Sequence, residues 1–191
     1  MAAGDPAERR PVFFHRRISM ATLEETMAAF DKALKDSNDR YLAWNGLGYF
    51  LSLALNEIES AQAHPEKRTE WMEKARLDFE SAQKERKNLP AEAQTVNQAM
   101  QSVATVLRQE FSAAAFETAS KDLMAMDHDK EKLGELEHYL VKFEQGVAKK
   151  DKALAEGLLA LAKVQFSLLS ESARTLATPL LGLAEQLLAA I

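Results

Sequence analysis

The segment LGELEHYLVKFEQGV, residues 133–147, decides the class of fold that this sequence predicts. Its apolar residues recur at alternating spacings of three and four, as they do in an α-helix that packs against another helix. They are Leu133, Leu136, Leu140, Phe143 and Val147. The same alternation continues through residues 153–191, straight through Pro179. We therefore expect an all-α protein, an antiparallel, bundle-like arrangement of about six helices.

The composition supports a helical protein and excludes several kinds of site. Ala, Leu, Glu, Lys and Gln dominate while Val and Ile are scarce, so local propensity favours helix over strand. The chain has no cysteine, which excludes a disulfide scaffold, a thiolate zinc site and a cysteine nucleophile. With a net charge of −5, it shows no electrostatic preference for nucleic acid. No stretch qualifies as a transmembrane segment, and we expect a cytoplasmic protein.

Polar clusters and prolines predict where the helices begin and end. Thr22 and Glu25 form a capping-box pattern that begins the first helix. Short polar residues at 36–39 and 127–129 predict breaks between helices. The predicted helices cover residues 23–35, 40–63, 65–87, 90–126 and 130–148, followed over 153–191 by one kinked helix or two collinear ones.

The segment 153–191 is the least polar part of the chain. A second apolar flank beside its main seam predicts either a central bundle helix with neighbours on two sides or an oligomer interface. A self-assembling helical coat or lipid-surface protein is therefore an alternative function. The flank consists of Leu154, Leu158, Leu161 and Leu168, and the seam residues expected to mediate oligomerisation are Leu169, Leu176, Leu180, Leu183 and Leu187.

Small and aromatic residues occur at helical spacings within residues 21–90. They are Phe30, Ala33, Trp44, Leu47, Gly48, Ala75, Phe79 and Ala82. In these positions the segment resembles the tetratricopeptide repeat, a helix-turn-helix unit with interlocking large and small residues. The resemblance implies a helical hairpin with a concave surface that holds a peptide or a partner helix, and it implies no catalysis. Ordinary packing of a helix pair uses the same residue types and is the other interpretation.

We therefore expect a flexible leader over residues 1–20 and a single all-α domain over 21–191, with repeat-like helices in 21–90 and long bundle helices in 91–191. The preferred function is a non-catalytic interaction or scaffold protein that presents a groove to another protein or peptide. The groove residues are predicted to be Trp44, Leu47, Gly48, Leu51, Trp71, Ala75 and Phe79.

Two glycines and two tryptophans in the same region suggest a close approach or a pocket. Gly46 and Gly48 lie within an apolar helix, where each costs about 1 kcal/mol relative to Ala. A neighbouring helix or a ligand would fill the space that they leave. A hydrophobic pocket beside Trp44 and Trp71 is the small-molecule hypothesis.

No pattern of catalytic or cofactor-binding residues is present, and we expect none. Glu135 and His138 form one Glu-x-x-His pattern of the kind that di-iron bundles use in pairs. The core-facing leucines of that segment would turn both residues outward. Because this one pattern is present, a metal-binding helical bundle or an enzyme is kept as the second alternative function. The trio at 127–129 is interpreted as a helix cap rather than an acid-base site.

Overall fold

A computed structural model describes residues 22–109 and 112–191 of the chain. This part contains six α-helices, a short 3-10 turn (η1, Pro65–Lys67) and no β-strand, which confirms the all-α prediction. The leader expected over residues 1–20 lies outside the described residues. The α-helices are α1 (Leu23–Ala63), α2 (Arg68–Arg86), α3 (Gln94–Gln109), α4 (Ala113–Ala148), α5 (Lys152–Leu168) and α6 (Glu171–Ala190).

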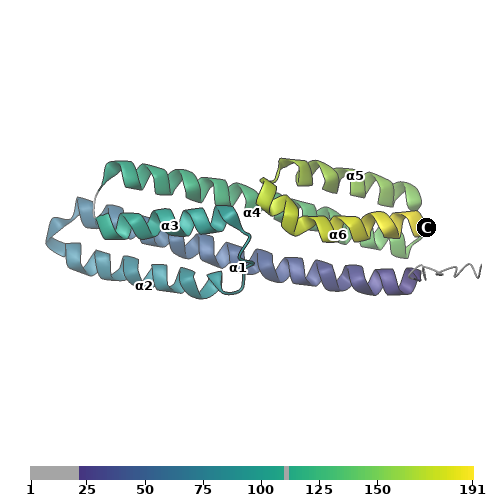
Figure 1. Ribbon diagram of the computed structural model, residues 1–191, viewed down its shortest axis with the longest axis horizontal. Helices are drawn as coiled ribbons and strands as arrows, with labels where there is room; N and C mark the ends of the chain where they lie inside the picture. The colour runs from purple at the N-terminus through teal and green to yellow at the C-terminus, as the bar shows by residue number, and fades with distance from the viewer. Residues whose placement is uncertain (1–21, 110–111) are drawn as a thin grey trace, which may run out of the picture.

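Two long helices, α1 and α4, run along the whole molecule (Figure 1). In one half of the molecule α2 and α3 pack beside them, and in the other half α5 and α6 do so. The 41 residues of α1 span about 60 Å at 1.5 Å per residue. The protein is thus two four-helix bundles placed end to end that share their two longest helices.

Each half has a hydrophobic core of its own. Trp44 of α1 and Val96 of α3 belong to the core of the α2–α3 half. Phe30 and Phe143 meet edge to face in the α5–α6 half, with ring centroids 5.9 Å apart. Phe166 packs against both clusters. The two cores are therefore in contact at the middle of the molecule.

The predicted break at residues 36–39 is wrong, because α1 continues through it. Ser37 is buried, and its hydroxyl donates a 2.5 Å hydrogen bond to Oε1 of Glu137 on α4. The side chain bonds a neighbouring helix instead of competing for its own backbone. The predicted helices 23–35 and 40–63 are consequently one helix.

The predicted break at residues 127–129 is also wrong, because α4 runs through it. Asp129 is only 1% exposed and accepts a 2.9 Å hydrogen bond from the hydroxyl of Thr95 on α3. It also accepts from the backbone N–H of Ser170 at 2.8 Å and from the hydroxyl of Ser170 at 2.5 Å. The carboxylate that suggested a local cap therefore joins three separate parts of the fold.

The predicted helix over residues 90–126 is two helices. The first of them, α3, ends at Gln109, and α4 begins at Ala113. The side chain of the N-cap residue Ser112 accepts a 3.3 Å hydrogen bond from the N–H of Ala115. From this cap α4 packs back along α3.

Residues 153–191 form a hairpin, so the prediction of one kinked helix or two collinear helices is wrong. The chain turns between Leu168 and the N-cap residue Ser170. His128 of α4 supports the turn, with Nε2 lying 3.2 Å from the carbonyl oxygen of Leu168. Pro179 lies within α6 and does not end it. The hairpin brings α5 and α6 side by side, both against α4.

Candidate functional site

The outer surface of α5 concentrates exposed hydrophobic side chains. Ten large hydrophobic side chains are exposed in the described part of the chain, and four of them lie on this helix of 17 residues. We call the row made by these four and the half-buried Leu158 the α5 face. Its residues are Leu154 (44% exposed), Leu158, Leu161 (46%), Val164 (54%) and Leu168 (49%).

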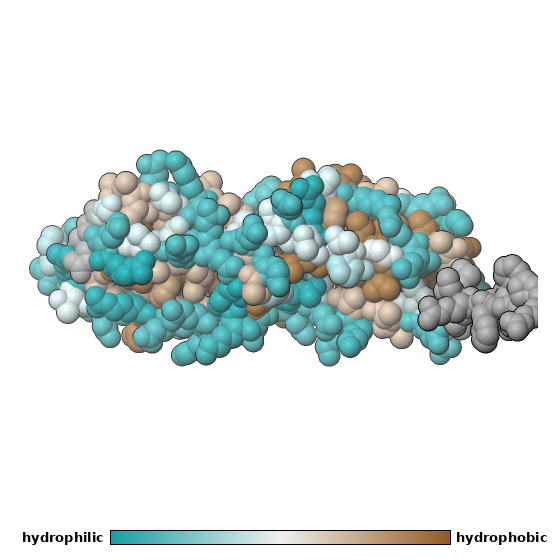
Figure 2. All heavy atoms as spheres, in the orientation of Figure 1, coloured by the Kyte–Doolittle hydropathy of each residue, from teal (hydrophilic) through white to brown (hydrophobic). Residues whose placement is uncertain are grey.

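Helical spacing places the α5 face on the side of α5 turned away from the core. Leu154, Leu161 and Leu168 are each seven residues apart, close to two full turns, and so form a straight row. The opposite side carries Ala155, Leu159 and Ala162, which are buried. Figure 2 shows hydrophobic residues gathered along α5. Of the described helices, only α4 and α6 contact α5, so none of them covers the α5 face.

Charged groups lie away from the α5 face. The charged residues of α5 are Lys152, Glu156 and Lys163. Lys163 is directed to α6, where its Nζ lies 2.7 Å from a carboxylate oxygen of Glu185. Contiguous exposed apolar surface on a soluble domain marks an interaction site more often than isolated apolar residues do. The α5 face is therefore the candidate interaction surface.

Of the two interpretations offered for the second apolar flank, the central bundle helix is not what the fold shows. The flank lies on the outside of α5. The seam expected to mediate oligomerisation lies on the inside. Its residues are Leu169, Leu180 and Leu187, which are buried, and Leu176 and Leu183, which are half-buried.

The predicted groove residues lie mostly inside the α2–α3 half. Only Trp71 and Phe79 are partly exposed, so a partner would reach the others only by opening the bundle. The antiparallel pairing of α1 with α2 does not test the resemblance to tetratricopeptide repeats, which stays a prediction. The buried members are Trp44, Leu47, Gly48, Leu51 and Ala75.

The pocket predicted beside Trp44 and Trp71 is too small for a ligand. The cavity at Trp44 has a volume of about 10 Å³, and Trp71 does not line it. That volume is about the space of one water molecule. Both indole N–H groups are buried without a hydrogen-bond partner.

The neighbouring-helix interpretation of the two glycines is confirmed. A Cβ at Gly48 would lie 3.1 Å from Cε of Met126 on α4. A Cβ at Gly46 would lie 3.3 Å from Cδ of Glu85 on α2. The two glycines thus allow α1 to approach two helices closely.

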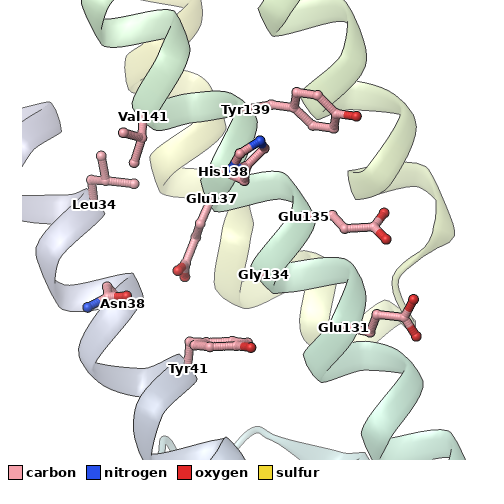
Figure 3. A pocket seen from close by; sticks show the side chains of 10 residues that line it. All are labelled: Leu34, Asn38, Tyr41, Glu131, Gly134, Glu135, Glu137, His138, Tyr139 and Val141. Carbon is pink, nitrogen blue, oxygen red and sulfur yellow. The ribbon is translucent and has the colours of Figure 1, made fainter.

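A shallow groove of about 540 Å³ lies between α1 and α4 in the α5–α6 half (Figure 3). Its floor includes Gly134, where a Cβ would lie only 2.9 Å from Cε2 of Tyr41. Figure 3 shows Glu137 pointing toward α1, while Glu131 and Glu135 point away from it. The carboxylates therefore do not converge on one point in the groove.

The Glu135–His138 pattern does not form part of a cluster. Oε2 of Glu135 accepts a 3.2 Å hydrogen bond from the ammonium group of Lys132. The ring of His138 is exposed and packs edge-on against Tyr139. Throughout residues 22–109 and 112–191, no group of three or more His, Asp or Glu side chains is placed to hold a metal ion.

Glu137 is a buried carboxyl group that the sequence pattern did not single out. Burial raises its pKa, while the hydrogen bond from Ser37 and the charge of Arg40 act in the opposite direction. The residue is 7% exposed. Its hydrogen bond joins the two long helices, which is a structural role.

Two carboxyl pairs also link α1 to neighbouring helices. Burial first, and then a hydrogen bond and charge repulsion from Asp78 on α2, together raise the pKa of Glu57 to about 7. The pKa of Glu144 on α4 is raised by burial and then by the same two effects from Asp31. Such pairs favour the protonated form and make stability depend on pH.

Comparisons with known proteins leave the α5 face as the main guide to function. No protein-family model, no curated protein and no solved structure matches this chain. No described helix is both long enough and apolar enough to cross a membrane. The function has to be inferred from the surfaces that the chain itself presents.

Proposed function

We propose that this protein is a non-catalytic, cytoplasmic interaction or scaffold protein that docks a partner helix on the α5 face. The single observation that carries the proposal is the uncovered row of apolar side chains along α5. Exposing such a row to water is unfavourable by about 25 cal/mol for each Å². A docked helix removes that cost and gains contacts along the row.

The rest of the fold suits a scaffold. Buried residues on the opposite side of α5 hold this helix against the core. The C-terminal end of α5 is supported by His128. A surface held rigidly before binding loses little conformational entropy when a partner docks. The partner site then lies on the outside of the α5–α6 half rather than among the buried residues around Trp44.

A photo-cross-linking experiment tests the docking surface. The amino acid p-benzoylphenylalanine replaces Leu161 in the full chain, expressed in the cells that produce it natively. The matched control is the same replacement at Leu77, which lies on α2 and is 54% exposed. We expect a discrete cross-linked species from position 161 that position 77 does not give.

The cross-linked species must also depend on the apolar character of the α5 face. Changing Leu154 and Leu168 to Glu is expected to abolish it without altering the helical content of the chain, because both side chains are half exposed. Equal cross-linking at positions 161 and 77, or cross-linking that survives the two Glu substitutions, contradicts the proposed function.

A further inference from the structure

The groove between α1 and α4 is a second surface, separate from the α5 face. It lies in the half of the molecule where α1 begins, and all its lining residues come from α1 and α4 (Figure 3). Its apolar part includes Leu34 and Tyr41 of α1, both half-buried, and Val141 of α4, which is 42% exposed. Three glutamates and a histidine also line it, and none of its lining residues is Lys or Arg. The groove therefore suits an occupant that is both apolar and positively charged.

Acidic side chains lie at both ends of the groove. At the end nearer the start of α1, Asp31 of α1 is in contact with Glu144 of α4. After burial, the hydrogen bond and the charge repulsion from Asp31 raise the pKa of Glu144. At the other end, Glu131 is 65% exposed and shares the ammonium group of Lys132 with Glu135, so two acidic groups face one basic group. Each end thus attracts positive charge.

The chain carries a matching stretch of sequence ahead of α1. Residues 9–17 read RRPVFFHRR, with two arginine pairs on either side of an apolar centre and no Asp or Glu among them. Four of the 24 basic and two of the 29 acidic residues precede Thr22, so residues 22–191 carry a net charge of −7. The stretch lies outside the described residues. Its positive charge is opposite to that of the rest of the chain, and its centre is apolar like the groove.

The length of chain before α1 is sufficient to reach the groove. Leu34 and Tyr41 lie about 18 Å and about 28 Å along α1 from Thr22, at 1.5 Å per residue. An extended chain covers about 3.3 Å per residue. A chain that turns back at Met20 and runs antiparallel to α1 would therefore carry Phe13 to about 23 Å, between the two groove residues.

The same count brings the arginine pairs to the two acidic ends. Arg16 would lie at about 13 Å, level with Asp31, which is also about 13 Å from the start of α1. Arg10 would lie at about 33 Å. The hydrogen bond of Ser37 to α4 fixes the register of the two long helices and places Glu131 at about 32 Å. The spacing of charges in the segment thus matches the spacing of acids along the groove.

We propose that residues 9–17 dock in the groove between α1 and α4 of their own chain, antiparallel to α1. Phe13 and Phe14 lie on the apolar part of the groove, and the arginine pairs lie at its two acidic ends. Because the segment and the groove belong to one chain, the effective concentration of the segment is about millimolar, so even a weak contact is occupied. The groove includes no residue of α5, and the docking is independent of the proposed function.

Disulfide trapping tests the docking, because the natural chain has no cysteine. Val12→Cys is combined in the full chain with Asn38→Cys, at an exposed position that lines the groove. The matched control combines Val12→Cys with Asp36→Cys. Asp36 is also exposed and lies almost as far along α1, but about 200° around the helix from Asn38.

The readout is the fraction of intrachain disulfide in a glutathione redox buffer at about 1 μM chain. We expect the 12–38 pair to form the disulfide at least about tenfold more readily than the 12–36 pair. Equal readiness of the two pairs overturns the inference. A disulfide that joins two chains, seen as a doubled mass under non-reducing conditions, overturns docking within one chain.

The preference for position 38 must also depend on the charge of the segment. Changing Arg16 and Arg17 to Glu is expected to remove the tenfold preference, whereas changing both to Lys is expected to retain it. Circular dichroism checks that all variants keep the same helical content. A preference that survives the two Glu substitutions overturns the proposed role of the arginines. None of the changed residues lies on α5, so each of these outcomes leaves the test of the α5 face unaffected.

Discussion

Replacing Asp129 with Ala is expected to destabilise the whole fold, because its carboxylate holds three parts of the chain together. It accepts hydrogen bonds from Thr95 and, through two donors, from Ser170. A hydrogen bond to a charged group contributes about 1.5–3 kcal/mol. The two hydroxyl donors can turn toward other acceptors, but the backbone N–H of Ser170 cannot. We therefore expect a loss of about 2–4 kcal/mol in the free energy of unfolding.

Urea unfolding monitored by two signals measures this loss. Far-ultraviolet circular dichroism reports all helices, whereas fluorescence of Trp44 and Trp71 reports the α2–α3 half. Both midpoints are expected to fall together, because Asp129 lies where the halves meet. The control is Asp127→Ala on the same helix, whose side chain is 44% exposed and pairs with Lys130. It should change stability by less than about 0.5 kcal/mol. A similarly small effect of Asp129→Ala would refute the reasoning.

Three further predictions use the same unfolding assay. Trp44→Ala should lower the free energy of unfolding by about 3–5 kcal/mol, because the Trp44 side chain is only 1% exposed. Trp71→Ala should lower it clearly less, because Trp71 is partly exposed, and equal losses would contradict this burial pattern. The pKa of Glu57 rises from an ordinary 4.5 to about 7 in the folded state, so between these values the folded chain holds a proton that the unfolded chain has lost. Stability should therefore fall as the pH rises from 4.5 through 7, and Glu57→Gln should remove the part of that fall that Glu57 causes; an identical pH profile would count against the assignment. Gly134→Ala should destabilise the chain, since its Cβ would lie 2.9 Å from Tyr41, yet stabilise it by up to about 1 kcal/mol when Tyr41 is also changed to Ala; the same sign in both backgrounds would be the contrary result.

The sequence predicted the fold class but placed several helix boundaries wrongly, for one physical reason. The residues that suggested breaks, around Ser37 and Asp129, are short polar side chains that often bond their own backbone. In this fold they bond other helices instead. Local patterns cannot reveal a partner that is 100 residues away, as Glu137 is from Ser37.

The candidate site was visible in the sequence but could not be assigned to the inside or the outside. The second flank that includes Leu154 and Leu161 was recognised as extra apolar surface. Whether it faced a neighbouring helix depended on the turn before Ser170, which makes α5 and α6 a hairpin. The residues predicted to line a groove around Trp44 are mostly buried in the structure, and the sequence did not show this because residues that fill a core and residues that line a groove share the same spacing.

The placement of α5 along one half of the two shared helices sets the dimensions of any assembly built through it. The helix α1 extends about 60 Å and α5 covers about 25 Å of one half, so about 35 Å of helix separates the α5 face from the far tip of the α2–α3 half. A partner docked on the α5 face would therefore lie at a fixed spacing from the tip of the α2–α3 half, because α1 and α4 run without interruption through both halves.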